Sequence, residues 1–478
     1  LRDVDANKTY RLVGGNTGRG IYEANTRFNV YIDVKNIPEM TSSALTADQI
    51  QFGGAFTLNS LVDLLHKAAT QGDHFHFGGK VAKHIQKVAN MAVRNNATVA
   101  GNLMLKHAHP DFPSDIFVLL ESLNAKLVLK SASGEVKKSP VEFLAHEMTK
   151  TVLFRVDIPS TTKRHHFVSY KITPRSENAH AYVNGAMMAE LDNNFIVKSK
   201  PNLVFGGISS NFVHAVKTEN YLIGKSLKDA QVLAESAKIL NGEVVPTSDP
   251  VLASVQYRKY LPQALFYKFI LSALGDLVEE KLRSGADQIQ RGLSSGQQAY
   301  ETDPSLYPVN KPIQKLEGKS QCTGEAQYID DMPRLPNELH AAFVLTTLGN
   351  CDIEAIDADL ALQMKGVVAF FDASDIPGKN SSVTYDLDEP IFTTKKSSYA
   401  GQAVGVVVAE TADLAREAAA KVTIKYTNRK KPILTIKEAL QHPDRVQEGP
   451  SSLPPRPVDL VDIDDLVQVS GEFEIGSQ

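Results

Sequence analysis

A glycine-rich run near the start of the chain has residue types that could bind a phosphate group. It reads GGNTGRG over residues 14–20, and closely spaced glycines let backbone N–H groups approach and cradle a diphosphate. The spacing is not G-x-G-x-x-G, and the residues that follow are typical of a strand and not of the helix that a Rossmann loop needs. The Gly-Lys-Ser/Thr of a Walker A loop is also missing. A plain glycine turn between two strands stays open as the alternative to a diphosphate site.

A second run, TVAGN over residues 98–102, combines small residues, a hydroxyl and an amide between apolar stretches. Two such loops in one domain could hold the two ends of one diphosphate. The alternative is another strand-to-turn transition that binds nothing. The pairing of the two runs therefore favours only modestly the interpretation that this domain binds a diphosphate-containing cofactor.

Other candidate sites have weaker patterns. Three closely spaced histidine pairs could be metal ligands: His74 and His76, His107 and His109, and His165 and His166. None has a carboxylate or thiolate partner at the spacing of zinc motifs, so no metal site is predicted. Cys322 and Cys351 are too few for an iron–sulfur cluster, a structural zinc or a disulfide framework, which fits a reducing compartment. Neither G-x-S-x-G nor H-E-x-x-H occurs, so hydrolase chemistry lacks a nucleophile or metal motif.

The composition is that of a globular protein with several domains. The 478 residues exceed the ~100–200 of one typical domain. Lys and Arg total 51 against 55 Asp and Glu, so there is no basic excess to bind nucleic acid. The longest apolar runs, such as AVGVVVA over 403–409, are far shorter than the roughly 20 residues that cross a bilayer. We expect a soluble, cytoplasmic fragment, because no signal-peptide pattern opens the chain and it stops within a strand-like alternation.

The elements that must position these residues are mixed strands and helices. Residues 11–40 predict a strand, a tight turn and a strand. Residues 57–72 predict a helix that ends on Gly72 as a C-cap. Its apolar face holds Leu58, Leu61, Leu65 and Ala68. A second helix is predicted to begin with Ser114 as N-cap and Asp115 in its first turn, where a carboxylate suits the helix dipole. The strand AKLVLK follows it.

The later part of the chain predicts further units. The segment 191–211 suggests a hairpin that enters a smaller unit, which then turns helical over 228–240 and 260–274. Residues 283–308 are rich in Gly, Ser, Gln and Pro and show no apolar period, as expected of a linker. Beyond it, residues 403–426 alternate strand, helix and strand with Thr411 as N-cap of the helix. Residues from 430 onward are rich in proline and polar side chains.

Three segments, taken in order, resemble the flavin-binding domain of the xanthine dehydrogenase and aldehyde oxidase family. They are RLVGGNTGRGIY, VRNNATVAGNLMLKHAHPDFPSDIFVLLESLNAKLVL and KITPRSENAHAYVNGAM. Residues 202–274 are similar to the small domain that follows the flavin-binding domain in this family. Three later segments are similar to the first domain of the molybdenum-binding portion: KSQCTGEAQYIDDMPRLPNELHAAFVL, FFDASDIPGKN and YAGQAVGVVVAETADLAREAAAKVTIKY. Nearly the whole chain is covered.

The resemblance implies an α+β, multidomain fold. Its parts are an FAD-binding PCMH-type domain, a small α+β flavoprotein C-terminal domain of the CO dehydrogenase type, a linker, an α/β hammerhead domain and the truncated start of the molybdopterin-binding domain. Their predicted bounds are 1–190, 195–282, 283–312, 313–430 and 431–478, with the first domain cut at its N-terminus. Iron–sulfur domains would precede residue 1, and the residues that hold molybdenum would follow residue 478.

The complete enzyme is thus expected to use FAD, molybdopterin and two iron–sulfur clusters, of which this chain would hold FAD alone. Electrons would pass from molybdenum through the clusters to the flavin. No catalytic side chain and no metal ligand is predicted here, because the isoalloxazine would carry the redox chemistry and the protein would position and tune it. The expected substrate is an aldehyde or an N-heterocycle, and the resemblance implies a homodimer.

Carried over position by position, the resemblance implies a set of FAD-binding residues. They are Leu12, Val13, Gly14, Gly15, Asn16, Thr17, Gly18, Arg19, Val88, Thr98, Val99, Ala100, Gly101, Asn102, Asp115, Leu153 and Lys171. Both small-residue loops would donate backbone N–H groups to the diphosphate, and the amides of Asn16 and Asn102 would add polar contacts. Lys171 would supply a cation. Val88 stands where some relatives carry an aromatic ring over the flavin.

Several of these positions have a structural alternative. Asp115 suits the first turn of a helix, Leu153 could be ordinary core, and Lys171 could be a solvated residue at a strand end.

The electron acceptor is a separate question. The loop over residues 172–182 would border the flavin. Its sequence PRSENAHAYVN is closer to the E-N-A-x-A-x-V-N pattern of aldehyde oxidases than to the more strongly charged loop of xanthine dehydrogenases.

The sequence therefore favours an aldehyde oxidase that passes electrons to dioxygen. The stretch KHAHPDFPSDIF resembles insect aldehyde oxidases in particular. The main alternative is a fragment of an NAD-linked xanthine dehydrogenase. Two others are a non-catalytic interaction or dimerisation remnant, against which the intact glycine loops argue, and a free-standing flavin reductase, against which the attached molybdenum-type domain argues.

Overall fold

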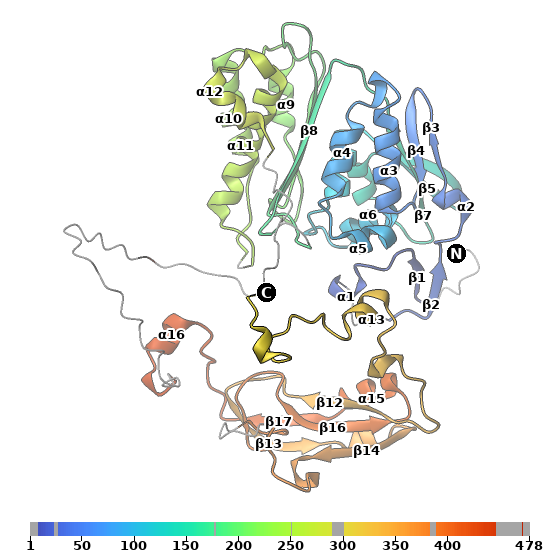
Figure 1. Cartoon of the computed structure of the whole chain (residues 1–478), viewed down its shortest axis with the longest axis vertical. Helices are drawn as coiled ribbons and strands as arrows, with labels where there is room; N and C mark the ends of the chain where they lie inside the picture. Colours follow the sequence, from blue (N-terminus) through green and yellow to red (C-terminus); the bar gives the residue numbers. More distant parts are fainter. Residues whose placement is uncertain are drawn as a thin grey trace, which may run out of the picture. The chain divides into compact units, whose positions relative to one another are not determined.

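The computed structural model describes residues 8–22, 27–175, 178–249, 251–288, 301–382, 389–445 and 471. The chain divides into two compact units, Leu1–Gln297 and Gln298–Gln478 (Figure 1). Within the described ranges, no helix has both the length and the apolar character to cross a membrane.

The glycine-rich run lies between two parallel strands. Strand β1 (Tyr10–Val13) pairs with β2 (Val30–Asp33) in parallel, with Tyr10 opposite Val30. The short helix α1 (Arg19–Tyr22) lies in the connection. Parallel strands need a crossover and cannot be joined by a tight turn. The predicted strand–turn–strand arrangement was therefore wrong, and the glycines begin a crossover instead.

A five-stranded antiparallel sheet, ordered β3-β4-β7-β5-β6, forms the next layer. Its strands are β3 (Ser43–Leu45), β4 (Gln49–Gly53), β5 (Lys126–Ser131), β6 (Gly134–Lys138) and β7 (Val152–Pro159). The predicted strand AKLVLK is β5 and is confirmed. The accompanying helices are α2 (Pro38–Thr41), α3 (Leu58–Ala69), α4 (Gly78–Ile85), α5 (Met91–Asn96), α6 (Val99–Ala108), α7 (Asp115–Ser122) and α8 (Pro140–Leu144).

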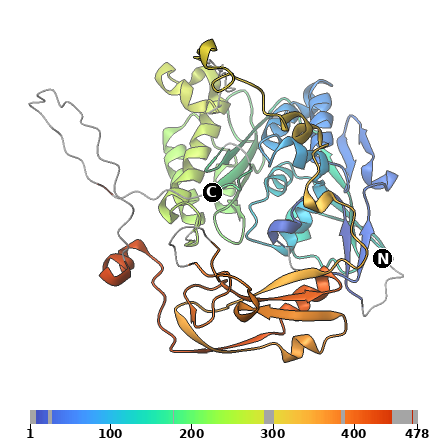
Figure 2. The same ribbon diagram turned by 60° about the horizontal axis from the view of Figure 1, so that its bottom comes forward.

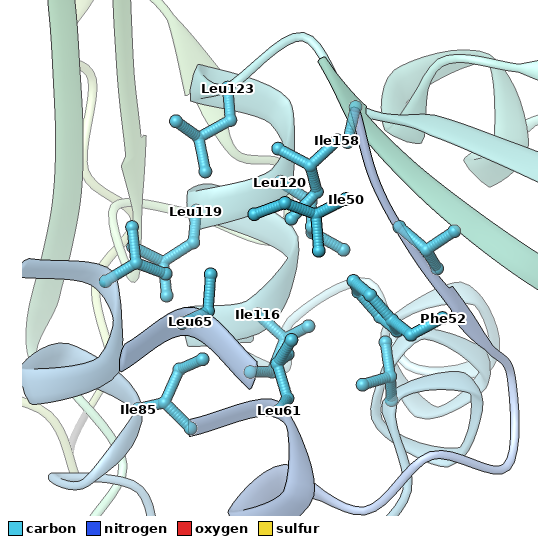
Figure 3. Packing of buried hydrophobic residues seen from close by; sticks show 14 of the residues in the cluster. Ile50, Phe52, Leu61, Leu65, Ile85, Ile116, Leu119, Leu120, Leu123 and Ile158 are labelled. Carbon is cyan, nitrogen blue, oxygen red and sulfur yellow. The ribbon is translucent and has the colours of Figure 1, made fainter. Parts of the chain in front are cut away.

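The first core lies between this sheet and helices α3, α4 and α7. Figure 3 shows Ile50, Phe52 and Ile158 of the sheet facing side chains of the three helices. The predicted apolar face of α3 is confirmed, since Leu58, Leu61, Leu65 and Ala68 are all buried. The predicted C-cap was wrong. Helix α3 ends at Ala69 with Thr70 as its cap, while Gly72, with φ +95°, precedes a 3₁₀ turn.

A second sheet, ordered β11-β10-β9-β8, is antiparallel throughout. Its strands are β8 (His165–Ile172), β9 (Val183–Glu190), β10 (Asn202–Gly206) and β11 (Val213–His214), and its helices are α9 (Val216–Leu222), α10 (Ala230–Glu243), α11 (Val255–Leu274) and α12 (Glu280–Arg283). The predicted hairpin over 191–211 is confirmed only for its second strand, β10, because the partner strand β9 ends at Glu190, before that segment. Alternate residues reach opposite cores, so that Met188 packs with the first core and Met187 with a second one.

Figure 1 shows helices on both sides of this sheet, with α10 and α11 on one side of β8 and α3 and α4 on the other. The sheet contains strands from either side of the predicted boundary at residue 190, because β9 ends there and its partner β10 begins at Asn202. The boundary itself stays a prediction.

A charged cluster joins α7 to the elements that follow β10. His214 Nδ1 lies 3.3 Å from Glu121 Oε1 of α7, and its Nε2 lies 2.8 Å from Glu219 Oε1 of α9. Glu121 and Glu219 are buried. Burial alone would lower the pKa of His214, but hydrogen bonds to the two carboxylates outweigh it and raise the pKa to about 9. His214 is therefore charged at neutral pH.

We expect the free energy of unfolding to fall as the pH rises from 6.5 toward about 9, because in this interval the unfolded chain has released the His214 proton while the folded chain still holds it. A group whose pKa is higher in the folded state than in the unfolded state stabilises the fold fully when the pH is below its unfolded-state pKa. This stabilisation is lost once the pH exceeds its folded-state pKa. The loss is about 2 kcal/mol after allowance for solvent screening. Urea unfolding across this interval measures it, and His214→Gln should flatten the profile. An unchanged slope in that variant would contradict the assignment.

The second unit contains two three-stranded antiparallel sheets, ordered β12-β16-β14 and β15-β13-β17 (orange in Figure 2). Its strands are β12 (His340–Leu345), β13 (Cys351–Asp357), β14 (Val367–Asp372), β15 (Lys396–Ser397), β16 (Ala403–Ala409) and β17 (Thr423–Thr427). Its helices are α13 (Gly318–Thr323), α14 (Asp359–Leu362), α15 (Ala412–Ala419) and α16 (Ile436–Leu440). Thr411 caps α15 as predicted, since its Oγ1 accepts from Leu414 N at 3.2 Å.

The predicted strand–helix–strand alternation of the second unit is β16, α15 and β17, but the two strands belong to different sheets. Short 3₁₀ helices complete the described elements. They are Asp73–Phe75, Gly275–Leu277, Ser284–Ala286, Pro304–Leu306, Ile329–Asp331, Ala373–Asp375 and Pro443–Arg445.

Candidate cofactor-binding site

Two adjoining cavities of about 290 and 450 Å³ lie in the first unit, in the size range of small-molecule sites. We call them the first and the second cavity. Both are lined by Arg11, Leu12, Gly14, Thr98, Gly101 and Leu105. A larger cavity of about 980 Å³ lies in the second unit and is lined by none of the predicted residues.

Most of the predicted residues meet at the first cavity, although they come from distant segments. Those that line it are Leu12, Gly14, Gly15, Asn16, Thr17, Gly18, Val88, Thr98, Gly101, Asn102, Asp115 and Lys171. Ala100 and Leu153 line the second cavity instead. Their roles in binding stay predictions, but the fold brings them together.

Three predicted residues line neither cavity. Val13 ends β1, where its carbonyl accepts from Val34 N at 2.9 Å. Arg19 turns toward Tyr31, whose hydroxyl accepts from it at 3.2 Å and whose ring lies 5.5 Å from its guanidinium carbon. Val99 is fully buried in the first core. Side-chain contact between these three and a ligand in either cavity is therefore not indicated.

The glycine loop presents a row of unused donors to the first cavity. Residues 14–18 all line it, and none of their backbone N–H groups has a hydrogen-bond partner among the residues that the structure describes. Asn16 adopts a positive φ of 53°. Successive free N–H groups in a turn form an anion-binding concavity. This part of the site therefore fits a diphosphate.

Gly15 fixes this loop in place by a close approach to helix α5. A Cβ atom at Gly15 would lie 1.8 Å from the carbonyl oxygen of Asn96, the last residue of that helix. Backbone atoms cannot give way as a flexible side chain can, so only glycine permits this contact.

The second small-residue run is the first turn of a helix and not a loop. Thr98 caps α6, and its Oγ1 accepts from Gly101 N at 3.1 Å. Val99 N donates to Phe56 O and Ala100 N to Gly54 O. The prediction that this run gives backbone donors to a diphosphate was therefore wrong for these residues, because their N–H groups are already bonded. The run still presents the positive end of α6 to the cavity.

Asn102 is the polar side chain that this helix adds. Its Oδ1 accepts from Ser114 Oγ at 2.5 Å, and Ser114 caps α7 by accepting from Phe117 N, as predicted. The Asn102 Nδ2 group has no partner within the described parts of the chain, so it can donate to a bound ligand.

A buried ion pair forms another wall of the first cavity. Lys171 Nζ lies 2.9 Å from Asp115 Oδ2, and the side chains are only 3% and 7% exposed. Asp115 Oδ1 accepts from Asn184 Nδ2 at 2.8 Å and from His84 Nε2 at 3.2 Å. Burial alone would raise the pKa of Asp115, but Lys171 and these hydrogen bonds hold it well below its ordinary value. Asp115 is therefore an anion, and Lys171 balances it.

The ion pair leaves donor capacity toward the cavity. An ammonium group has three N–H donors. Lys171 Nζ uses one on Asp115 and one on the carbonyl of Lys87, at 3.0 Å. The third can serve a ligand, since Lys171 lines the cavity. The interpretation of Lys171 as a solvated strand-end residue was wrong, whereas Asp115 does begin α7 as the helical alternative required.

Sequence reasoning missed several residues of this site. His84 lies on the buried face of α4, and burial lowers its pKa, so the neutral ring donates its Nε2 proton to Asp115. Asn184 stands within the otherwise apolar, fully buried part of β9. An amide in such a strand signals an internal partner, because an unbonded one is costly. The rings of Tyr22, Phe112 and His180 also line the first cavity.

The loop that the resemblance placed beside the flavin reaches this cavity. Asn178, Ala179 and His180 line it, while residues 176 and 177 lie outside the described residues. The described parts of the chain contain no group of three or more His, Cys, Asp or Glu side chains that could hold a metal ion.

Three family models match the chain. Residues 1–161 match the FAD binding domain in molybdopterin dehydrogenase, residues 168–273 the CO dehydrogenase flavoprotein C-terminal domain, and residues 323–430 the a/b hammerhead domain of aldehyde oxidase and xanthine dehydrogenase. The predicted fold class, α+β and multidomain, is confirmed by this layout.

Curated relatives extend over the whole chain. The abscisic-aldehyde oxidase of Arabidopsis thaliana is 30% identical over 512 aligned residues, which cover 100% of this chain and 38% of that protein. Xanthine dehydrogenase 1 of the same plant is 31% identical, over 92% of this chain and 34% of the relative. The chain thus spans little more than a third of these two proteins.

Among solved structures, quinoline 2-oxidoreductase from Pseudomonas putida 86 aligns with a TM-score of 0.47 and 23% identity, over 55% of this chain and 89% of that one. Because matching family models occur in the family's order and the aligned relatives cover all or nearly all of the chain, this chain belongs to the aldehyde oxidase and xanthine dehydrogenase family and contains its FAD-binding domain.

Proposed function

We propose that this chain is the FAD-binding, electron-transferring portion of an aldehyde oxidase. In the whole protein, aldehydes would be oxidised at a molybdenum centre, and electrons would leave through FAD to dioxygen. The observation that carries the FAD site is a row of N–H groups over residues 14–18, which have no hydrogen-bond partner in the described parts of the chain. They lie on the wall of a cavity that the buried cation Lys171 also lines.

The residues of this chain would bind and orient the cofactor. The glycine loop would hold the diphosphate, Asn102 Nδ2 would donate to a phosphate or ribityl oxygen, and Lys171 would offer a cation to a polar edge of the ring system. Leu153 would give an apolar contact in the second cavity. FAD, when bound, supplies the redox chemistry. No side chain of the site is proposed as an acid or base.

Dioxygen is proposed as the acceptor because of the loop after β8. Where this loop borders the first cavity, it contributes Asn178, Ala179 and His180. None of these three is a lysine or an arginine that could bind the phosphates of a dinucleotide. NAD would need such a second anion site, whereas dioxygen needs only access. NAD stays the alternative acceptor, as the resemblance to xanthine dehydrogenases implies.

The acceptor can be tested by reoxidation. The full chain is loaded with FAD, reduced with dithionite under argon and mixed with either dissolved oxygen or NAD⁺, while the visible flavin band is followed. Oxidation of the flavin by dioxygen releases two electrons and two protons to form hydrogen peroxide. We expect oxygen to react at least about tenfold faster than NAD⁺, a difference of about 1.4 kcal/mol in barrier. Faster reoxidation by NAD⁺ would favour the dehydrogenase.

The domain bounds are part of this proposal. We propose an FAD-binding domain over 1–190, the flavoprotein C-terminal domain over 195–282, a linker over 283–312, the hammerhead domain over 313–430 and the start of the molybdopterin-binding domain after it. The family matches to 1–161, 168–273 and 323–430 support this order. The homodimer and the aldehyde or N-heterocycle substrate are proposed for the whole protein only.

A further inference from the structure

Four rings from different segments meet at the edge of the first cavity, and we call them the aromatic wall. Tyr22 ends α1, His109 follows α6, Phe112 precedes α7, and His180 lies in the loop after β8. The Tyr22 ring centroid lies 4.9 Å from that of His109, 5.6 Å from Phe112 and 6.0 Å from His180. Phe112 and His180 are 5.4 Å apart and meet edge-on. These spacings are those of favourable aromatic pairs.

The aromatic wall forms one side of the first cavity. Tyr22, Phe112 and His180 line the first cavity, while His109 packs behind Tyr22. Tyr22 Oη lies 3.4 Å from both ring nitrogens of His180. Burial raises the pKa of Tyr22 to about 12, so the phenol keeps its proton. Tyr22 is therefore held in place on three sides, with its remaining surface toward the cavity.

Tyr22 is also close in sequence to the donors that would hold the diphosphate. Only three residues separate it from Gly18, the last residue of the glycine loop, and the two are joined directly, because Tyr22 N donates to Gly18 O at 3.2 Å. A group held by the loop would therefore lie near Tyr22, since both line the first cavity. Val88, on the same cavity, offers only an aliphatic side chain.

We propose that Tyr22 contacts the isoalloxazine ring of bound FAD, with His180 and Phe112 fixing its position, and that the aromatic wall supplies the ring contact that Val88 does not. The inference rests on the proposed binding of FAD. An aromatic side chain offers a flat, polarisable surface that complements another ring system. A phenol close to an excited flavin also transfers an electron to it, and the electron returns, so the flavin loses its fluorescence without net chemistry.

The composition makes this quenching a specific test. The chain contains no tryptophan. Among the described residues, Tyr22 is the only tyrosine that lines the first cavity, and Tyr10 is the only one that lines the second. Each cavity thus has one strong electron donor for an excited flavin, and the two are separately removable.

The experiment compares Tyr22→Phe with the unmodified full chain, both loaded with FAD and freed of excess. Flavin emission is divided by the absorbance of bound flavin. We expect several-fold higher emission in Tyr22→Phe with nearly unchanged FAD affinity, because the ring stays and only the donor is lost. Tyr22→Leu, which removes the ring, should also weaken FAD binding by roughly threefold to tenfold.

Two matched controls locate the ring. Tyr10→Phe removes the donor of the second cavity, and Tyr31→Phe removes a hydroxyl that bonds Arg19 outside both cavities. Neither should change the emission. An increase in Tyr10→Phe alone would place the isoalloxazine in the second cavity and overturn the inference, as would bound FAD with unchanged emission in Tyr22→Phe. If the unmodified chain binds no FAD at all, the proposed function fails as well. The visible flavin absorbance of the chain distinguishes this result from bound FAD whose emission does not change.

Discussion

Replacement of Gly15 by valine should abolish FAD binding by a chain that still folds. A Cβ atom there would lie 1.8 Å from the Asn96 carbonyl oxygen and 2.4 Å from its carbon. Both are backbone atoms, so the loop must move away from α5. The N–H groups of residues 14–18 then lose their common position. Loss of two charge-assisted hydrogen bonds, at about 1.5–3 kcal/mol each, weakens binding by roughly a hundredfold or more.

Gly20 provides the matched control. It lies in the same run, its φ is not positive, and a Cβ there meets nothing within 4 Å. Gly20→Val should keep FAD binding within about threefold of the unmodified chain. Gly101→Val should also impair binding, because its Cβ would approach Thr98 Oγ1 to 2.9 Å and disturb the cap of α6. FAD retained in a folded Gly15→Val chain, as measured by ultrafiltration, would show that the diphosphate lies elsewhere.

Replacement of Lys171 by methionine should destabilise the fold strongly, even without a ligand. The change leaves the Asp115 carboxylate buried without its cation, which typically costs about 3–5 kcal/mol. The pKa of Asp115 should then rise, since Lys171, the largest of the influences that oppose burial, is gone and only the hydrogen bonds from His84 and Asn184 remain. The loss should shrink at acidic pH, because a protonated Asp115 needs no cation. Urea unfolding of the FAD-free chain at neutral and acidic pH measures both effects.

A double variant separates stability from binding. Lys171→Met with Asp115→Asn removes both charges, so more than half of the lost stability should return, while FAD affinity should stay low because the cavity still lacks its cation. Recovery of FAD binding together with stability would mean that Lys171 serves the fold alone. A single Lys171→Met variant that loses less than about 1 kcal/mol would contradict the description of the ion pair.

Local patterns in the sequence were sufficient for several elements. The apolar spacing of α3 identified its buried face, and Ser114 and Thr411 were recognisable as N-caps because each precedes a helical period. These features depend only on residues that are close together in the sequence. The end of α3 was missed because Gly72 offered a more familiar cap than Thr70, which is helical in conformation.

The glycine loop and α6 were harder for identifiable reasons. Parallel and antiparallel strands show the same apolar alternation, so nothing local distinguished a crossover between β1 and β2 from a hairpin. Residues 98–102 contain a β-branched valine and a glycine, both of which disfavour helices. Their helical turn is stabilised instead by bonds from Val99 and Ala100 to the carbonyls of Phe56 and Gly54.

The candidate site depends on still longer contacts. Asn184 is 69 residues from Asp115, and His180 is 158 residues from Tyr22. No periodicity links such positions, and each residue taken singly fits an ordinary core or loop. The resemblance to a family named many of the residues that line the two cavities, but also Val13, Arg19 and Val99, which line neither. The positions of His84, Asn184 and the aromatic wall required the fold.

The central claim is that this chain binds one FAD in the cavities beside residues 14–18. The most direct measurement is the visible absorption spectrum of the full chain after incubation with FAD and removal of the excess, followed by release and chromatography of the bound chromophore. We expect flavin bands and close to one FAD per chain. A well-folded but colourless chain would contradict it.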